Sequence, residues 1–165
     1  MAETARESGI EGRIVNVSSG SHRWYSGDPL SYLRLLAAGQ VRYDAGRAYG
    51  LSKLAMVMHT KEMARRLKKM GANVTVNCVN PGIARTRLNR DIEGFVLIGD
   101  RLTQAAATTC YVAVHPAMSG VSGKYYADCN MVETSNCEEE AEARLWCESE
   151  AMIHAAEERA GEETE

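Results

Sequence analysis

Two short runs of β-branched and apolar residues each end in a polar turn. Residues 13–18 read RIVNVS and lead into Ser19-Gly20, and residues 73–79 read NVTVNCV and lead into Asn80-Pro81-Gly82. Apolar runs of this length that are bounded by turn residues predict buried strands. A third strand is predicted over residues 124–128 (KYYAD), after the turn at residues 120–123.

A helical period of about 3.6 residues marks the segment between the first two strands. Over residues 48–70 it places on one face Leu51, Leu54, Ala55, Met58, Met63, Leu67 and Met70, and Gly71 follows as a stop. Further helices are predicted over residues 102–114 and 138–158, with a short one within 30–38 and helix-like sequence over 2–8. The remainder of 21–46 and residues 83–100 read as irregular. Strands that alternate with helices in this order predict an α/β fold with a parallel sheet.

The composition of the chain is that of one ordinary globular domain. It has 165 residues, of which 45% are hydrophobic and 25% charged, and a net charge of −3. The charge is unevenly spread, because residues 133–165 carry 12 Glu and two Arg, whereas residues 1–132 carry 17 basic and 10 acidic side chains. The basic residues are scattered and have no aromatic residues between them, so nucleic-acid binding is not predicted. We expect one domain over 1–158 and an acidic, disordered tail over 159–165.

Targeting and metal signals are weak throughout the sequence. The polar first residues do not form a secretory signal, and the best apolar run, at residues 95–98, is far shorter than a transmembrane helix of about 20 residues. The cysteines are odd in number and form no C-x-x-C pair, which predicts reduced thiols in a cytosolic or similar compartment. They are Cys78, Cys110, Cys129, Cys137 and Cys147. The four histidines lack the spacing of metal ligands, so no metal site is predicted.

Tyr49 and Lys53 are the first candidates for chemistry. They lie four residues apart on the predicted long helix, hence on one face. A phenol ordinarily titrates near 10, and a neighbouring ammonium favours the phenolate, which suits general acid–base work. Two unrelated surface residues would give the same spacing, so the pair needs its context.

That context comes from the ends of the predicted strands. Ser19 follows the first strand and Pro81-Gly82 follow the second, and ligands of open parallel sheets bind outside the carboxyl ends of the strands. These residues and the start of the Tyr49 helix are therefore predicted to meet at one edge. Taken singly, Ser18-Ser19-Gly20 is also read as a simple turn and Pro81-Gly82 as a strand breaker.

Four segments in this order resemble the short-chain dehydrogenase/reductase family: GRIVNVSS (12–19), AYGLSK (48–53), VNPGIART (79–86) and GVSGKYYADC (120–129). Within the family, the chain is similar to the branch of retinol dehydrogenase-like and WW-domain oxidoreductase-like proteins. Among these it most resembles the plant members related to the dehydrogenases of the chloroplast inner-envelope translocon. The resemblance covers about residues 10–150.

The resemblance implies a role for each matching residue. Ser19 matches the serine that binds the substrate carbonyl or hydroxyl, Tyr49 the catalytic acid/base, and Lys53 the lysine that lowers the pKa of that tyrosine and binds the nicotinamide ribose. Four further residues match the loop that holds the nicotinamide end of NAD or NADP, namely Pro81, Gly82, Ile83 and Thr86. The implied reaction is hydride transfer between this cofactor and an apolar alcohol or carbonyl substrate.

Only the carboxyl-terminal half of the family fold is matched. The implied fold class is a Rossmann-like, doubly wound parallel sheet that lacks its amino-terminal βαβ units. No T-G-x-x-x-G-x-G turn follows any predicted strand, and such a turn binds the cofactor pyrophosphate. We therefore expect an incomplete short-chain dehydrogenase domain with negligible activity in these 165 residues.

The alternative is a non-catalytic, truncated paralogue that acts as an interaction or regulatory subunit. The resemblance also implies a homo-oligomer or a partner at the chloroplast envelope, and so a cytoplasmic or chloroplast-associated protein. The long stretch between Ser19 and Tyr49 suits an insertion over the substrate. Its aromatic residues are candidates either for an apolar pocket or for ordinary packing, and they are Trp24, Tyr25, Tyr32 and Tyr43.

Overall fold

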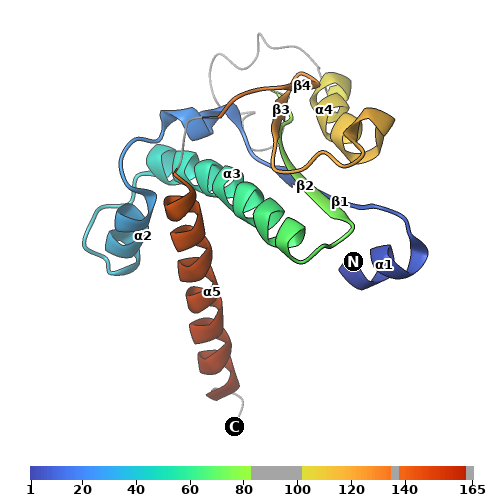
Figure 1. Ribbon diagram of the computed structural model, residues 1–165. Coiled ribbons are helices and arrows are strands. Elements are labelled where there is room, and N and C mark those ends of the chain that lie inside the picture. Colours follow the sequence, from blue (N-terminus) through green and yellow to red (C-terminus); the bar gives the residue numbers. More distant parts are fainter. Residues whose placement is uncertain (83–101, 135–137, 163–165) are drawn as a thin grey trace.

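A computed structural model describes residues 1–82, 102–134 and 138–162, and its core is a four-stranded sheet in the order β1-β2-β3-β4 (Figure 1). Strands β1 (Gly12–Val17) and β2 (Val74–Asn80) are parallel, with Gly12 opposite Val74 and Val17 opposite Val79. Strand β3 (Tyr125–Ala127) is parallel to β2, and β4 (Asn130–Met131) is antiparallel to β3. The predicted parallel α/β fold is confirmed.

The helices are α1 (Ala2–Ser8), α2 (Pro29–Ala37), α3 (Ala45–Lys69), α4 (Leu102–Val114) and α5 (Glu139–Glu162), with short 3₁₀ helices η1 (Gly20–Trp24) and η3 (Pro116–Met118). Helices α3 and α4 both contact β1 and β2, from opposite faces of the sheet (Figure 1). Alternate residues along each strand consequently meet different helices. Cys78 packs with Val57 of α3, whereas the next residue, Val79, packs with Val112 of α4. Both faces of β2 are covered, and its residues from Val74 to Val79 are all buried.

Strand β4 is an element that the sequence pattern did not predict. Asp128 and Cys129 form the two-residue turn between β3 and β4, and their φ angles are 49° and 60°. Two successive positive φ values are those of a type I′ turn, which normally takes Asn-Gly or Asp-Gly. The backbone N–H of Cys129 donates to Thr108 Oγ1 at 3.2 Å. This tertiary contact holds a turn that its own residues favour only weakly.

Helix α3 begins three residues before the predicted start. The side chain of Asp44 accepts a hydrogen bond from the Arg47 N–H at 2.6 Å and so caps the helix. The carboxyl-terminal end agrees with the prediction, since Lys69 is the last helical residue and Gly71 has a φ of +63°. The helix therefore carries Tyr49 in its second turn, firmly within regular structure.

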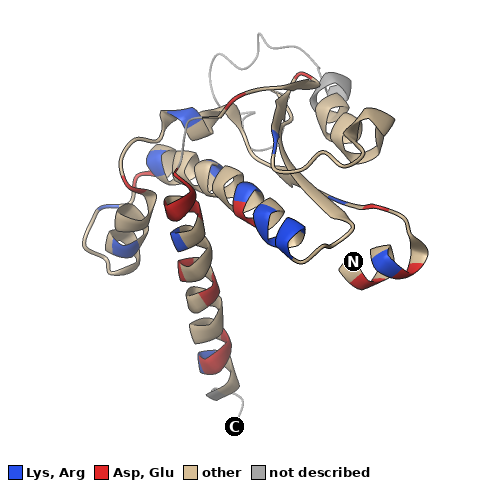
Figure 2. Ribbon diagram, in the orientation of Figure 1, with Lys and Arg blue, Asp and Glu red and all other residues tan. Residues whose placement is uncertain are grey.

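Helix α5 is joined to α3 by apolar contacts and by buried charge. Leu145 is 1% exposed and packs with three residues of α2 and α3, which are Leu30, Leu54 and Met58. Glu142 is equally buried, with Lys61 Nζ at 3.4 Å from Oε1 and an Arg65 guanidinium nitrogen at 2.6 Å from Oε2. Figure 2 shows these opposite charges along the two helices. Because two cations face it, the Glu142 carboxylate is compensated although it is buried.

Beyond this junction, α5 continues away from the sheet to Glu162 (Figure 1). Residues 159–162, which the sequence analysis assigned to a disordered tail, are helical. Residues 163–165 lie outside the described range. The acidic composition predicted a solvated segment, and residues 150–161 are exposed, but the helical pattern extends further than expected.

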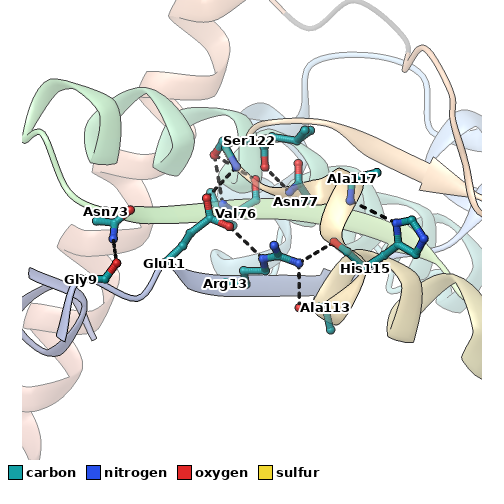
Figure 3. Close-up of polar contacts among 12 residues, drawn as sticks. Gly9, Glu11, Arg13, Asn73, Val76, Asn77, Ala113, His115, Ala117 and Ser122 are labelled. Carbon is teal, nitrogen blue, oxygen red and sulfur yellow. Dashed lines mark hydrogen bonds and ion pairs between the residues drawn. The ribbon is translucent and has the colours of Figure 1, made fainter.

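Hydrogen bonds of the Glu11 and Arg13 side chains link the amino end of β1 to the end of α4 and to Gly120 (Figure 3). Arg13 donates to Glu11 at 2.8 Å and to the carbonyl oxygens of Ala113 and His115 at 3.3 and 2.9 Å. The second oxygen of Glu11 accepts the N–H of Gly120 at 2.6 Å. A guanidinium presents several donors in a fixed plane, so one side chain ties β1 to the end of α4. The predicted site residue Ser19 follows the opposite, carboxyl end of β1.

Replacing Leu145 should test how far α5 contributes to the fold. Leu145→Ala is expected to lower the free energy of unfolding by about 2–5 kcal/mol, because it leaves a cavity between α3 and α5. The matched control is Met152→Ala on the same helix, where the side chain is 43% exposed and the change should stay within about 0.5 kcal/mol. Urea unfolding followed by circular dichroism measures both. Equal values for the two variants would contradict the proposed anchoring of α5.

Candidate active site

The carboxyl ends of β1 and β2 lie side by side and continue their ladder into the following loops. The Ser18 N–H donates to the Val79 carbonyl at 2.8 Å, one residue beyond the last strand pair. Ser19 then caps η1, its Oγ accepting a hydrogen bond from the Ser21 N–H at 3.3 Å. The chain turns at this point because Ser19 leaves the ladder in an extended conformation and its side chain satisfies a backbone donor of η1.

The turn of α3 that bears Tyr49 and Lys53 packs directly against this loop. The buried Ser18 hydroxyl donates to the Lys53 carbonyl at 2.7 Å. Gly50 faces η1 so closely that a Cβ at this position would lie 3.4 Å from the Ser21 carbonyl oxygen. A larger side chain at Gly50 would press the two backbones apart. The helix is therefore fixed to the end of β1 at the height of its second and third turns.

Tyr49 and Lys53 lie on one face of α3, as their spacing predicts. The Tyr49 side chain is partly exposed, and the Lys53 Nζ lies 5.5 Å from the centroid of its ring. The same ammonium group approaches the Val17 carbonyl at 3.5 Å, which directs it toward the end of β1. A phenol and an ammonium group placed together beside a serine loop can exchange a proton with a bound alcohol or carbonyl.

Pro81 and Gly82 follow β2 at the same edge. The Gly82 N–H donates to Asn80 Oδ1 at 3.1 Å, and Gly82 has a φ of +82°, which favours glycine. Asn80 also lies beside the Ser19 loop, since its Nδ2 is 3.7 Å from the position that a Cβ of Gly20 would take. The other two predicted residues of this loop, Ile83 and Thr86, lie outside the described residues.

The aromatic residues between Ser19 and Tyr49 have different environments. Tyr32 is 4% exposed and belongs to the core, with the guanidinium of Arg47 4.2 Å from its ring centroid. Arg47 lies also over Tyr25, at 5.6 Å. Trp24 and Tyr43 are 80% and 64% exposed. For Tyr32 on α2, ordinary packing is the correct interpretation, because its side chain is buried and lies against Arg47 of α3.

The sequence analysis missed the polar layer beneath the site. Ser18 was read only as the end of a strand and as part of a turn, and His22 was considered only as a metal ligand. Both are buried, and each bonds to a carbonyl of a predicted catalytic residue, Ser18 to Lys53 and His22 to Ser19. Cys78 lies below them, and its burial raises the pKa of its thiol to about 11. A single buried polar residue leaves no periodic pattern, so only the adjacency of the two serines was available as a signal.

The chain is similar in sequence to known proteins. The family described as short chain dehydrogenase matches residues 37–95. Short-chain dehydrogenase TIC 32 B, chloroplastic, of Brassica napus is 42% identical over 146 residues, which cover 82% of this chain and 44% of that protein. Human retinol dehydrogenase 14 is 37% identical, over 67% of this chain and 36% of its own length. The chain belongs to the short-chain dehydrogenase family.

A solved structure supports the fold assignment. The crystal structure of an uncharacterized protein from Mycobacterium paratuberculosis superposes with a TM-score of 0.61 at 25% identity, covering 86% of this chain and 50% of that one. The chain thus spans about half or less of the relatives that it matches, and it corresponds to part of a Rossmann-like short-chain dehydrogenase.

Residues 1–82, 102–134 and 138–162 lack two further features. None of the helices in these segments is both long and apolar enough to span a membrane. The same segments hold no cluster of three or more potential metal-ligating side chains.

Replacing Ser18 should show how strongly the loop is tied to α3. Ser18→Ala is expected to lower the free energy of unfolding by about 1–3 kcal/mol, because it removes a hydrogen bond to the Lys53 carbonyl whose donor is buried. Ser52→Ala is the matched control, since Ser52 also bonds to a carbonyl of α3 but is exposed. Chemical denaturation gives both values. A cost at Ser52 as large as that at Ser18 would show that burial of the bond is unimportant.

Cysteine reactivity offers a second test of the layer beneath the site. Cys110 and Cys147 are exposed, whereas Cys78 is buried with a pKa of about 11. Because the thiolate is the reactive form, iodoacetamide at pH 8 should modify Cys110 and Cys147 in the folded chain and spare Cys78. Peptide mass spectrometry after a short exposure reads out each site, and modification in denaturant provides the control. If Cys78 were labelled as fast as Cys110, the buried layer that contains it would be readily accessible to the reagent in the folded chain.

Proposed function

We propose that this chain carries the substrate-side catalytic residues of an NAD(P)-dependent short-chain oxidoreductase. Its reaction is hydride transfer between the nicotinamide and an apolar alcohol or carbonyl compound. The observation that carries the proposal is the meeting of three segments at one sheet edge: the Ser19 loop, the Tyr49–Lys53 turn of α3 and the Asn80-Pro81-Gly82 turn. Family membership supports the same chemistry.

Each residue takes one role in the proposed reaction. The Ser19 hydroxyl binds and orients the substrate oxygen. The Tyr49 hydroxyl gives a proton to the carbonyl oxygen during reduction and takes one from the alcohol during oxidation. The Lys53 ammonium, which lies near the Tyr49 ring and the Val17 carbonyl, is placed to bind the ribose hydroxyls of the cofactor. The bound cofactor supplies or accepts the hydride.

The residues present fit the nicotinamide end of the cofactor and no more of it. Pro81 and Gly82 form a turn at the carboxyl end of β2, and none of the described residues has an atom within 4 Å of the position that a Cβ of Gly82 would take. The glycine-rich turn that binds a pyrophosphate through its backbone amides is not in the sequence. We therefore expect the 165 residues alone to bind NADH and NADPH at best weakly and to show negligible turnover.

A second function is favoured by one feature of the sheet. Within the described residues, β1 hydrogen-bonds to β2 only, so its other side offers unpaired backbone groups. A strand edge of this kind can accept a strand of another protein. The alternative proposal is accordingly a non-catalytic interaction or regulatory subunit. The catalytic set Ser19, Tyr49 and Lys53 favours the enzymatic proposal, because strand addition does not use it.

The relatives suggest where such a protein acts. The Brassica napus relatives are named chloroplastic, and the human ones are named retinol dehydrogenases. We propose a chloroplast-associated or cytoplasmic enzyme with a small apolar substrate. A second copy or an envelope protein is the proposed macromolecular partner.

Replacing Tyr49 tests the enzymatic proposal. The chain is fused behind the amino-terminal half of the Brassica napus relative, and oxidation of apolar alcohols is followed through the absorbance of the reduced nicotinamide. Tyr49→Phe should lower kcat by about 100-fold or more, since it removes the proton donor without changing the shape of the site. Tyr111→Phe, the same change on α4, is the control and should leave kcat unaltered.

The same variants separate the two proposals. If the chain is a binding module, Tyr49→Phe should leave partner binding intact. In that case the fused protein should show no turnover even before the substitution. A fused protein that turns over equally well with phenylalanine at position 49 would overturn the catalytic assignment. Micromolar binding of NADPH by the unfused chain would contradict the expected need for a pyrophosphate-binding turn.

A further inference from the structure

His22 is the most completely buried polar residue of the loop that carries Ser19. Its side chain is 1% exposed, and its Nδ1 lies 2.7 Å from the Ser19 carbonyl oxygen. The backbone N–H of His22 donates to the same oxygen at 3.2 Å. The Ser19 peptide group is thus held twice by one residue, from the main chain and from the side chain.

The chemistry of this contact fixes the tautomer of the ring. A carbonyl oxygen only accepts hydrogen bonds, so Nδ1 must carry the proton. Burial lowers the pKa of His22, and the charges of Arg23 and Lys61 lower it further, against the opposing effect of the Ser19 carbonyl. The neutral ring therefore has a bare Nε2, and that nitrogen finds no hydrogen-bond partner within the described part of the chain.

Packing alone does not favour an imidazole at this buried position. A buried polar atom without a partner costs free energy that an apolar side chain of the same size would avoid. The ring does pack, since it meets Tyr125 of β3 edge-on with the centroids 4.8 Å apart. A phenylalanine or leucine would serve that contact without the cost of Nε2. What they would lack is the Nδ1–H donor to Ser19.

The neighbouring contacts make this donor decisive for Ser19. Gly50 brings η1 against α3 at Ser21, and the Ser18 hydroxyl holds the Lys53 carbonyl. Ser19 lies between these two fixed points, and the two hydrogen bonds to its carbonyl oxygen fix the peptide plane that follows its Cα. Its Oγ accepts the Ser21 N–H, which further restricts the side chain.

We infer that His22 is a positioning residue, whose Nδ1–H holds the Ser19 peptide so that the Ser19 hydroxyl faces the Tyr49–Lys53 turn of α3. The catalytic importance of this Ser19 orientation rests on the proposed function. The contact itself is a property of the folded chain, and it is measured without turnover.

Two amide variants of His22 separate the donor from the ring. The side-chain nitrogen of asparagine can occupy the place of Nδ1, whereas that of glutamine reaches the place of Nε2. In His22→Asn, the carbonyl ¹³C resonance of Ser19 should stay near its wild-type shift, and the amide of residue 22 should remain protected from hydrogen exchange. In His22→Gln, the resonance should move and the amide should exchange about tenfold faster, the effect of losing one buried hydrogen bond. Both are measured on the 165-residue chain by NMR.

The wild-type ring gives an independent signature. Long-range ¹H–¹⁵N correlation should place the proton on Nδ1 and leave Nε2 bare. A proton on Nε2 would overturn the inference, because a bare Nδ1 cannot donate to Ser19. Equal changes in the two amide variants would also overturn it and assign the effect to ring packing. An inactive fused enzyme would instead count against the proposed function and would leave these readouts unaffected.

Discussion

The parallel pairing of β1 with β2 is the constraint on which the rest of the structure depends. Because the two strands run in one direction, the loops that follow them leave the sheet at the same edge. The Ser18–Val79 bond extends the ladder into the first loop, and Asn80 lies beside Gly20 in the second. A shift of one residue in this register would turn Cys78 and Val79 to the opposite helices and would separate the loops.

The long helix adds the third component of the site through two close contacts with the sheet. Thr60 accepts a hydrogen bond from Asn16 Nδ2 at 2.8 Å on the buried face of β1, and Ser18 bonds to Lys53 one residue beyond the end of that strand. These contacts lie two turns apart on α3, so they fix both its position along β1 and its rotation. Tyr49 and Lys53 are thereby directed to the edge where the loops meet, and the site is a consequence of how the helix crosses the strand.

Much of the fold followed from periodicity, and the failures have a common cause. The strands at residues 13–18 and 73–79 and the helices at 48–70 and 102–114 carry their own patterns, and the structure agrees within a few residues. Strand β4 depends on a hydrogen bond to Thr108 of α4. The first turn of α3 depends on the Asp44 cap, which precedes the residues with the apolar period. The order of Ser19, Tyr49 and Lys53 was readable because motifs are local. The bonds of Ser18 and His22 were not readable, since they arise only when η1 packs on α3.

The proposed substrate chemistry and the binding of a pyrophosphate need different parts of a parallel sheet, and this difference connects the two proposed functions. The residues proposed to handle the substrate and the nicotinamide lie at the carboxyl ends of β1 and β2, whereas a pyrophosphate needs a glycine-rich turn at the end of a further strand. Any such strand that joined this sheet beside β1 would cover its unpaired backbone groups and bring its own turn to the same edge. The same addition would therefore supply both a partner for the side of β1 that has none among the described residues and the glycine-rich turn that the sequence lacks. The proposed interaction at this edge and the proposed catalysis at the Tyr49–Lys53 turn would then be two consequences of one strand pairing.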